Sequence, residues 1–197
     1  MHHVWVNATG SWPYYLDDTD RMAWIGLAVE TIRLFDWKAV AFCQMTTHVH
    51  AIFEIPDVRL PDGMRHLNLE YSRGFNRRHD RVGCFVRQRY GSRRIVDGRD
   101  LLDTYAYVVL NPVVEGMCPR AEDWRWSSYA TTIGLSSDLP FVDASRVRGE
   151  LSGSTEKLRQ LVTAVGERRL AARAMSRFLA PGHVAMGRVP PGHVLGR

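Results

Sequence analysis

The stretch KAVAFCQMTTHVHAIFEI, residues 38–55, decides the fold because it holds two apolar runs separated by a short polar step. Residues 38–45 and 48–55 each have the length and composition of a β-strand, and the turn near 45–47 is short enough to make the two strands consecutive. Pro56 ends the pair, because proline cannot donate a backbone hydrogen bond to a sheet. The stretch therefore predicts two neighbouring strands.

His48 and His50 stand on either side of Val49 in the second of these strands. Successive side chains of a strand point to opposite faces, so both imidazoles share one face. Two imidazoles on one face of a rigid strand can bind a divalent metal together. A structural zinc site that adds Cys43 or Cys84 is an alternative, but it lacks a convincing fourth ligand.

The flanking segments predict an α+β fold. A strand over 2–8 precedes a helix that Asp18 or Thr19 can cap, and a second helix over 60–79 has apolar residues at 64, 67, 71 and 75. Residues 83–96 are interpreted as a strand, straight or bent near Gly91, and 98–117 as a helix interrupted by Pro112. The order strand, helix, strand, strand, helix, strand, helix predicts an antiparallel sheet with helices packed on it.

The composition changes after about residue 135. Residues 1–135 are predicted to be the main domain, and residues 136–197 a helical extension with a helix over 154–175. The extension ends in a Gly/Pro-rich tail with two PGHV copies, which we expect to be flexible. No stretch of eighteen apolar residues occurs, and three scattered cysteines without a CxxC pair favour reduced thiols. We therefore expect a cytoplasmic protein with no membrane partner.

Residues 65–99 contain ten arginines, no lysine and three acidic residues. The guanidinium group suits phosphate oxygens and also stacks on bases, and four aromatic residues interleave with these arginines. The segment favours binding of single-stranded or hairpin nucleic acid. The alternative is a solvated face in which core aromatics alternate with surface charge. The candidate DNA-binding residues are Arg73, Arg77, Arg78, Arg87, Arg89 and Arg93.

Tyr107 and Asn111 are four residues apart in TYAYVVLNPV, residues 104–113. A helix would place both on one face, whereas a strand would separate them by roughly 13 Å. The preceding residues favour a helix that ends close to Asn111, because the position before a proline disfavours helical geometry. A buried tyrosine and a helix-terminal asparagine would explain the pair equally well.

Six segments in order give the chain a family resemblance over residues 2–134. They are DDTDR, CQMTTHVHAIFE, LNLEYSRGFNRRHDRVGCF, RQRYGS, YVVLNPVVEGM and DWRWSSY. Together they resemble the single-tyrosine HUH transposases, and most closely the REP-associated tyrosine transposases. The resemblance departs at Thr47, where the family usually has asparagine.

The resemblance implies a ferredoxin-like antiparallel sheet with packed helices. It makes His48 and His50 metal ligands, with Asn111 as the third ligand, for Mg²⁺ or Mn²⁺. It makes Tyr107 the nucleophile, with Tyr105 as its near competitor, and Arg89 a DNA contact.

The implied activity is cleavage and rejoining of single-stranded DNA near hairpins through a 5′-phosphotyrosine. The alternatives are a replication-initiation or relaxase type of HUH nickase and a catalytically silent hairpin-binding protein of the same fold. The resemblance leaves open whether the protein acts as a monomer or as a homodimer.

Overall fold

The computed structural model describes residues 1–10, 12–56, 59–86 and 90–179. Its sheet contains four antiparallel strands in the order β2-β3-β1-β4. The strands are β1 (His2–Asn7), β2 (Lys38–Gln44), β3 (His48–Glu54) and β4 (Gly91–Arg94). The element order β1-α1-β2-β3-α2-β4 with this strand order is the ferredoxin-like arrangement. The predicted α+β class is confirmed, as is the pairing of the two strands in 38–55.

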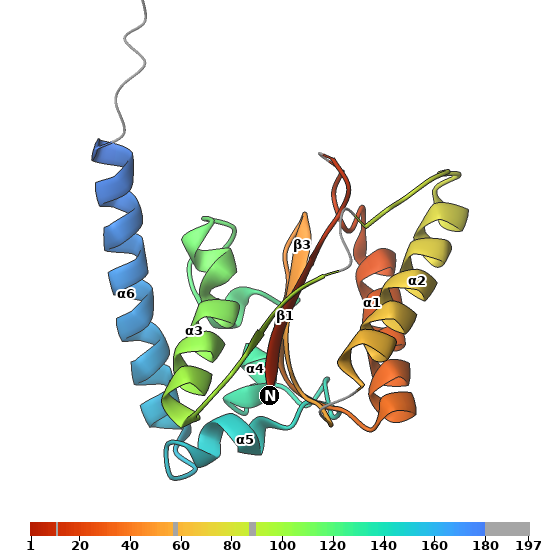
Figure 1. Cartoon of the computed structure of the whole chain (residues 1–197). Coiled ribbons are helices and arrows are strands. Elements are labelled where there is room, and N and C mark those ends of the chain that lie inside the picture. Colours follow the sequence, from red (N-terminus) through yellow and green to blue (C-terminus); the bar gives the residue numbers. More distant parts are fainter. Residues whose placement is uncertain (11, 57–58, 87–89, 180–197) are drawn as a thin grey trace, which may run out of the picture.

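Helices cover both faces of the sheet (Figure 1). The helices α1 (Asp18–Phe35) and α2 (Leu60–Arg78) cover one face, and α3 (Gly98–Val114) covers the other, with α6 (Thr155–Leu179) outside it. Three short elements complete the described chain, namely η1 (Ala121–Asp123), α4 (Tyr129–Thr132) and α5 (Ala144–Gly149). Each face has its own apolar core, and the predicted apolar positions of α2 are all buried in the first.

The alternation of β3 separates its apolar and polar side chains. Val49, Ala51 and Phe53 pack into the core beneath α1 and α2. His48 and His50 point to the opposite face, on which α3 lies, as the alternation predicted. At the sheet edge, a Cβ at position 91 would lie 2.0 Å from the indole of Trp5. Gly91 therefore lets Trp5 lie against β4 on the same face as the histidines.

The N-terminus of α1 is capped one residue earlier than predicted. Asp17, rather than Asp18 or Thr19, has an extended backbone and accepts a 3.1 Å hydrogen bond from the amide of Asp20. Asp17 and Asp20 also form ion pairs with Arg78 at the end of α2. The choice of cap thus depends on a contact between helices that the local sequence does not contain.

Helix α3 continues through Pro112, so the predicted interruption is wrong. The helix runs to Val114, and the amide of Glu115 donates a 2.9 Å hydrogen bond to the carbonyl of Asn111. Proline removes one backbone donor from a helix interior. Burial of Leu110, Asn111 and Pro112 between the sheet and α6 outweighs that loss.

Among the described residues after 135, helices α5 and α6 share a core with α3, whereas Val142 packs into the core beneath α1 and α2. Leu158 and Val162 of α6 are buried in the cluster that contains Leu110. A Cβ at Gly166 would lie 3.2 Å from Cδ2 of Leu110, so the two helices approach closely there. The predicted tail, residues 180–197, lies outside the described residues. Nowhere in the described part of the chain is a helix both long and apolar enough to cross a membrane.

Candidate active site

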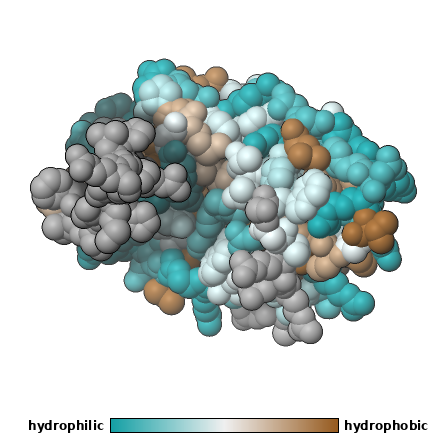
Figure 2. All heavy atoms as spheres, turned by 90° about the horizontal axis from the view of Figure 1, so that it is seen from above, coloured by the Kyte–Doolittle hydropathy of each residue, from teal (hydrophilic) through white to brown (hydrophobic). Residues whose placement is uncertain are grey.

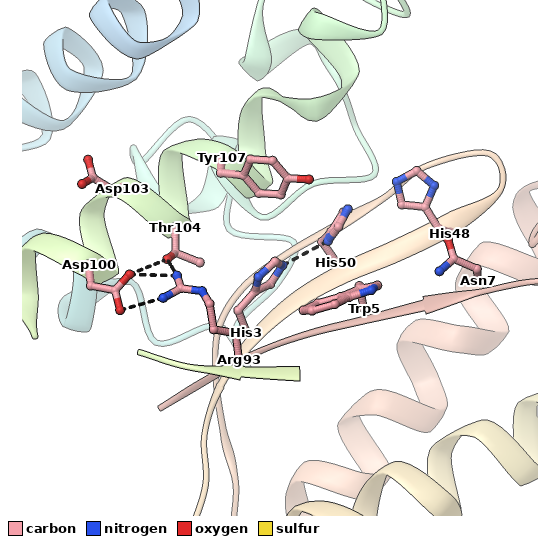
Figure 3. Close-up of a pocket in the computed structure, with 10 residues that line it drawn as sticks. All are labelled: His3, Trp5, Asn7, His48, His50, Arg93, Asp100, Asp103, Thr104 and Tyr107. Atoms are coloured by element: carbon pink, nitrogen blue, oxygen red, sulfur yellow. Dashed lines mark hydrogen bonds and ion pairs between the residues drawn. The ribbon is translucent and has the colours of Figure 1, made fainter. Parts of the chain in front are cut away.

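A pocket of about 590 Å³ opens between the sheet and α3 (Figure 3). Three of the strands and α3 contribute to it. Its lining residues are His3, Trp5 and Asn7 of β1, His48 and His50 of β3, Arg93 of β4, and Asp100, Asp103, Thr104 and Tyr107 of α3.

The two histidines predicted to be metal ligands lie side by side in this pocket. The rings of His48 and His50 have centroids 4.9 Å apart and are nearly perpendicular. Each ring makes its hydrogen bond through Nδ1, His48 with the hydroxyl of Thr47 and His50 with Nε2 of His3, both at 3.0 Å. These contacts leave Nε2 of both histidines for a ligand in the pocket.

The environment of these histidines favours their neutral form. Burial, helped by the charges of neighbouring histidines and Arg169, lowers the pKa of His50 to about 3. Burial also lowers the pKa of His48, and burial together with Arg93 lowers the pKa of His3 to about 4. Neutral imidazole is the form that binds metal ions. The lone pairs are therefore available at neutral pH without competition from protons.

Tyr107 faces the pocket, and Tyr105 does not. The side chain of Tyr107 is 40% exposed, and its ring centroid lies 5.5 Å from that of His50. Tyr105 is fully buried in the core between α3 and the sheet. The helical form of 98–114 settles the ambiguity in the sequence, because it places Tyr107 on the face of α3 that looks toward the histidines.

Asn111 lies one turn beyond Tyr107 and is not part of the pocket lining. It is 7% exposed, and its Oδ1 accepts a 3.1 Å hydrogen bond from Nη2 of Arg169. The structure thus brings His48, His50 and Tyr107 together and holds the amide of Asn111 against α6.

The donors in the pocket fit a metal that takes most of its ligands from outside the protein. Among the described residues, no three His, Cys, Asp or Glu side chains are grouped to hold a metal ion. Cys43 is buried and Cys84 is exposed, and neither lines the pocket, which argues against the zinc alternative. Two neutral imidazoles leave open positions for phosphate oxygens and water, which suits Mg²⁺ or Mn²⁺.

Arg169 of α6 is a site residue that the sequence did not reveal. Its guanidinium carbon lies 4.5 Å from the ring centre of Tyr107, and its Nη1 donates a 2.9 Å hydrogen bond to the carbonyl of Tyr107. More than sixty residues separate the two, and no motif links them. His3 was also missed, although its alternation with Trp5 and Asn7 along β1 is a signal that they share one face.

The candidate DNA-binding arginines do not form one surface. Arg93 lines the pocket, where it pairs with Asp100 and Thr104. Arg73, Arg77 and Arg78 belong to α2, on the opposite face of the sheet (Figure 1). Arg73 pairs with Glu70, whereas Arg77 is exposed. Arg87 and Arg89 lie outside the described residues.

The surface at the end of the molecule where α1 begins and α2 ends is largely polar. Seen from above, hydrophilic residues and residues of intermediate hydropathy cover most of its visible described part (Figure 2). The hydrophobic residues form small, separate patches. A surface of this kind suits a polar partner better than a large apolar one.

Comparisons with known proteins agree with the resemblance found in the sequence. No protein-family model matches the chain. A Haemophilus influenzae protein named "Putative REP-associated tyrosine transposase" is 24% identical over 111 residues, which span 51% of this chain and 63% of that relative. The solved structure of a REP-associated tyrosine transposase bound to a REP hairpin matches with a TM-score of 0.60 and 18% identity, over 68% of this chain and 81% of that one. This chain is therefore similar to the REP-associated tyrosine transposases, in sequence over half of its length and in fold over two thirds of its length.

Proposed function

We propose that the protein is a transposase that cleaves and rejoins single-stranded DNA near hairpins, with Tyr107 as its nucleophile. The observation that carries the proposal is the exposure of the Tyr107 phenol in the same pocket as the paired imidazoles of His48 and His50. One chain supplies all three side chains, so a monomer suffices to build the site. The similar proteins support the substrate, since one of them was solved with a REP hairpin bound.

In the proposed reaction, the phenol oxygen of Tyr107 attacks the phosphorus of a phosphodiester. The bond from phosphorus to the 3′ oxygen breaks, the 3′ oxygen leaves with the proton that the phenol loses, and the 5′ phosphate stays on the tyrosine. Attack by a 3′-hydroxyl of another strand reverses these steps and releases Tyr107. The phosphotyrosine retains the phosphoester bond, so rejoining needs no ATP.

The surrounding residues position the reactants. His48 and His50 would hold Mg²⁺ or Mn²⁺, which polarises the phosphate and stabilises the developing charge. Arg169 restrains the ring of Tyr107 by stacking on it. Arg93 lines the pocket in an ion pair with Asp100, and a phosphate of the strand would have to compete with that carboxylate to contact it. The proposed DNA contact and the free cysteines support a cytoplasmic location for this activity.

The proposal is tested by incubating the full chain with labelled hairpin DNA and Mn²⁺ and resolving covalent protein–DNA adducts on a denaturing gel. The wild type should give a metal-dependent adduct, Tyr107→Phe should give none, and the matched variant Tyr105→Phe should still give it. An adduct that survives in Tyr107→Phe would show that another residue is the nucleophile.

A second candidate function is hairpin binding without cleavage. The observation that favours it is the hydrogen bond from Arg169 to Oδ1 of Asn111, which occupies the amide expected to be the third ligand. Tight hairpin binding in the same experiment with no adduct at any Mn²⁺ concentration would support this function over the transposase.

A further inference from the structure

Of the described imidazoles that line the pocket, His3 is the one that the proposed reaction does not use. Strand β1 pairs with β3 so that Trp5 lies opposite His50 and Asn7 opposite His48, which brings His3 to the same face. Nε2 of His3 lies 3.0 Å from Nδ1 of His50, and the two rings stack with centroids 5.2 Å apart (Figure 3). Both side chains are 7% exposed, so water does not compete strongly for this contact.

A hydrogen bond between two imidazole nitrogens requires an N–H on one ring and a lone pair on the other. If His3 donates, a neutral His50 carries its own proton on Nε2, and that nitrogen cannot bind a cation. If His50 donates from Nδ1, its Nε2 carries the lone pair. Only the second arrangement presents a donor atom of His50 to the pocket.

We propose that His3 is a positioning residue that accepts a hydrogen bond from Nδ1–H of His50 and thereby keeps the Nε2 lone pair of His50 directed at the pocket for a divalent metal. The proposal rests on the proposed function only in assigning that pocket to a metal. Metal-binding histidines are usually held in this way, with the second nitrogen donating to a fixed acceptor.

The second histidine has a matching arrangement. Nδ1 of His48 lies 3.0 Å from the hydroxyl of Thr47, and a hydroxyl oxygen can accept a hydrogen bond from Nδ1–H. Both rings would then present Nε2 to the same space. His3 is itself held in place, because its ring contacts the ring of Trp5, with centroids 5.2 Å apart, and the ring of Tyr107, with centroids 5.9 Å apart. An acceptor restrained by contacts with two aromatic rings can hold one orientation of His50.

The test measures Mn²⁺ binding to the full chain by titration calorimetry at neutral pH. His3→Phe keeps a flat ring but removes the acceptor, so Mn²⁺ should bind about 10- to 100-fold more weakly. His3→Gln restores an acceptor oxygen and should recover most of the affinity. His66→Gln changes a histidine on α2, across the sheet, and should leave the affinity unchanged. His48→Ala and His50→Ala each remove a proposed metal ligand, so Mn²⁺ should bind more weakly to both variants.

Nitrogen NMR of the metal-free protein gives a readout independent of metal and of activity. His50 should carry its proton on Nδ1 in the wild type and lose this preference in His3→Phe. A proton on Nε2 of wild-type His50 would overturn the inference, even if His3→Phe failed to fold. Mn²⁺ affinity that is unchanged in His3→Phe but lost in His48→Ala and His50→Ala would overturn the inference. It would still support the assignment of His48 and His50 as metal ligands. Unchanged affinity in all these variants would overturn both.

Discussion

The guanidinium of Arg169 lies over the ring of Tyr107, 4.5 Å from its centre, and connects the C-terminal helix α6 to the candidate nucleophile. The same side chain donates hydrogen bonds to the carbonyl of Tyr107 and to Oδ1 of Asn111. Its positive charge also contributes to lowering the pKa of His50. One residue of α6 therefore restrains two candidate site residues and adds a cation close to a third.

Replacing Arg169 should affect stability and metal binding in opposite directions. Arg169→Ala removes the stacking on Tyr107 and leaves Oδ1 of Asn111 without this donor, so the free energy of unfolding should fall by about 1–2 kcal/mol. The substitution also removes a positive charge beside the pocket and releases the side-chain amide of Asn111. Both effects should make Mn²⁺ bind more tightly.

Urea unfolding and Mn²⁺ calorimetry measure the two effects. Arg168→Ala is the matched control, because the Nε of Arg168 donates its hydrogen bond within its own helix, to the carbonyl of Ala164. Weaker Mn²⁺ binding in Arg169→Ala would mean that Arg169 supports the third ligand rather than competing for it.

Arg78 should act in folding rather than in DNA binding. Its guanidinium pairs with Asp17 and with the buried Asp20, which ties the end of α2 to the start of α1. Arg78→Ala should therefore lower the unfolding temperature. The exposed neighbour Arg77 has no such role, so Arg77→Ala should leave the unfolding temperature unchanged. Thermal unfolding of the two variants, followed by circular dichroism, checks this, and equal midpoints would contradict it.

The buried histidines should make the metal-free protein less stable in mild acid. The pKa of His50 is about 3 and that of His3 about 4 in the folded chain, against about 6.5 when unfolded. Below pH 6.5 the unfolded chain binds protons that the folded chain does not, so the free energy of unfolding falls as the pH drops, by up to about 1.4 kcal/mol per pH unit for each histidine. Above pH 6.5 this contribution is constant.

Urea unfolding between pH 7.5 and 5, in the presence of a chelator, measures this slope. His50→Phe removes one of the two buried imidazoles, so the free energy of unfolding should depend less steeply on pH. A slope identical to that of the wild type would show that His50 does not stay neutral in the folded protein.

Removal of the metal should abolish cleavage and spare hairpin binding. His48→Ala removes one of the two imidazoles, and the lost charge stabilisation should reduce adduct formation at least about 100-fold. Chelation of the wild type should do the same, and added Mn²⁺ should restore only the wild type. Full adduct formation by His48→Ala would contradict the assignment of this residue to the metal.

The features that follow from local patterns could be predicted from the sequence. Alternation along 48–54 places His48 and His50 on one face, and the apolar spacing of α2 identifies its buried side. The rule that a proline interrupts a helix failed at Pro112. Burial between the sheet and α6 keeps the helix intact beyond this residue.

Contacts between distant segments could not be predicted. Arg169 reaches Asn111 because Gly166 lets α6 approach α3, but the sequence does not show which element Gly166 packs against. The contact of His3 with His50 depends on the register between β1 and β3. The described candidate arginines are divided between two faces of the sheet, because those of α2 lie on the face opposite the pocket, whereas Arg93 of β4 lines the pocket.

The central claim is that Tyr107 becomes covalently bonded to DNA. The most direct measurement is mass spectrometry of the protein–DNA adduct formed with a hairpin substrate and Mn²⁺, after digestion with nuclease and protease. We predict a single modified peptide that carries a nucleotide 5′-phosphate on Tyr107. A nucleotide on any other residue, or hairpin bound tightly with no modified peptide, would contradict the account.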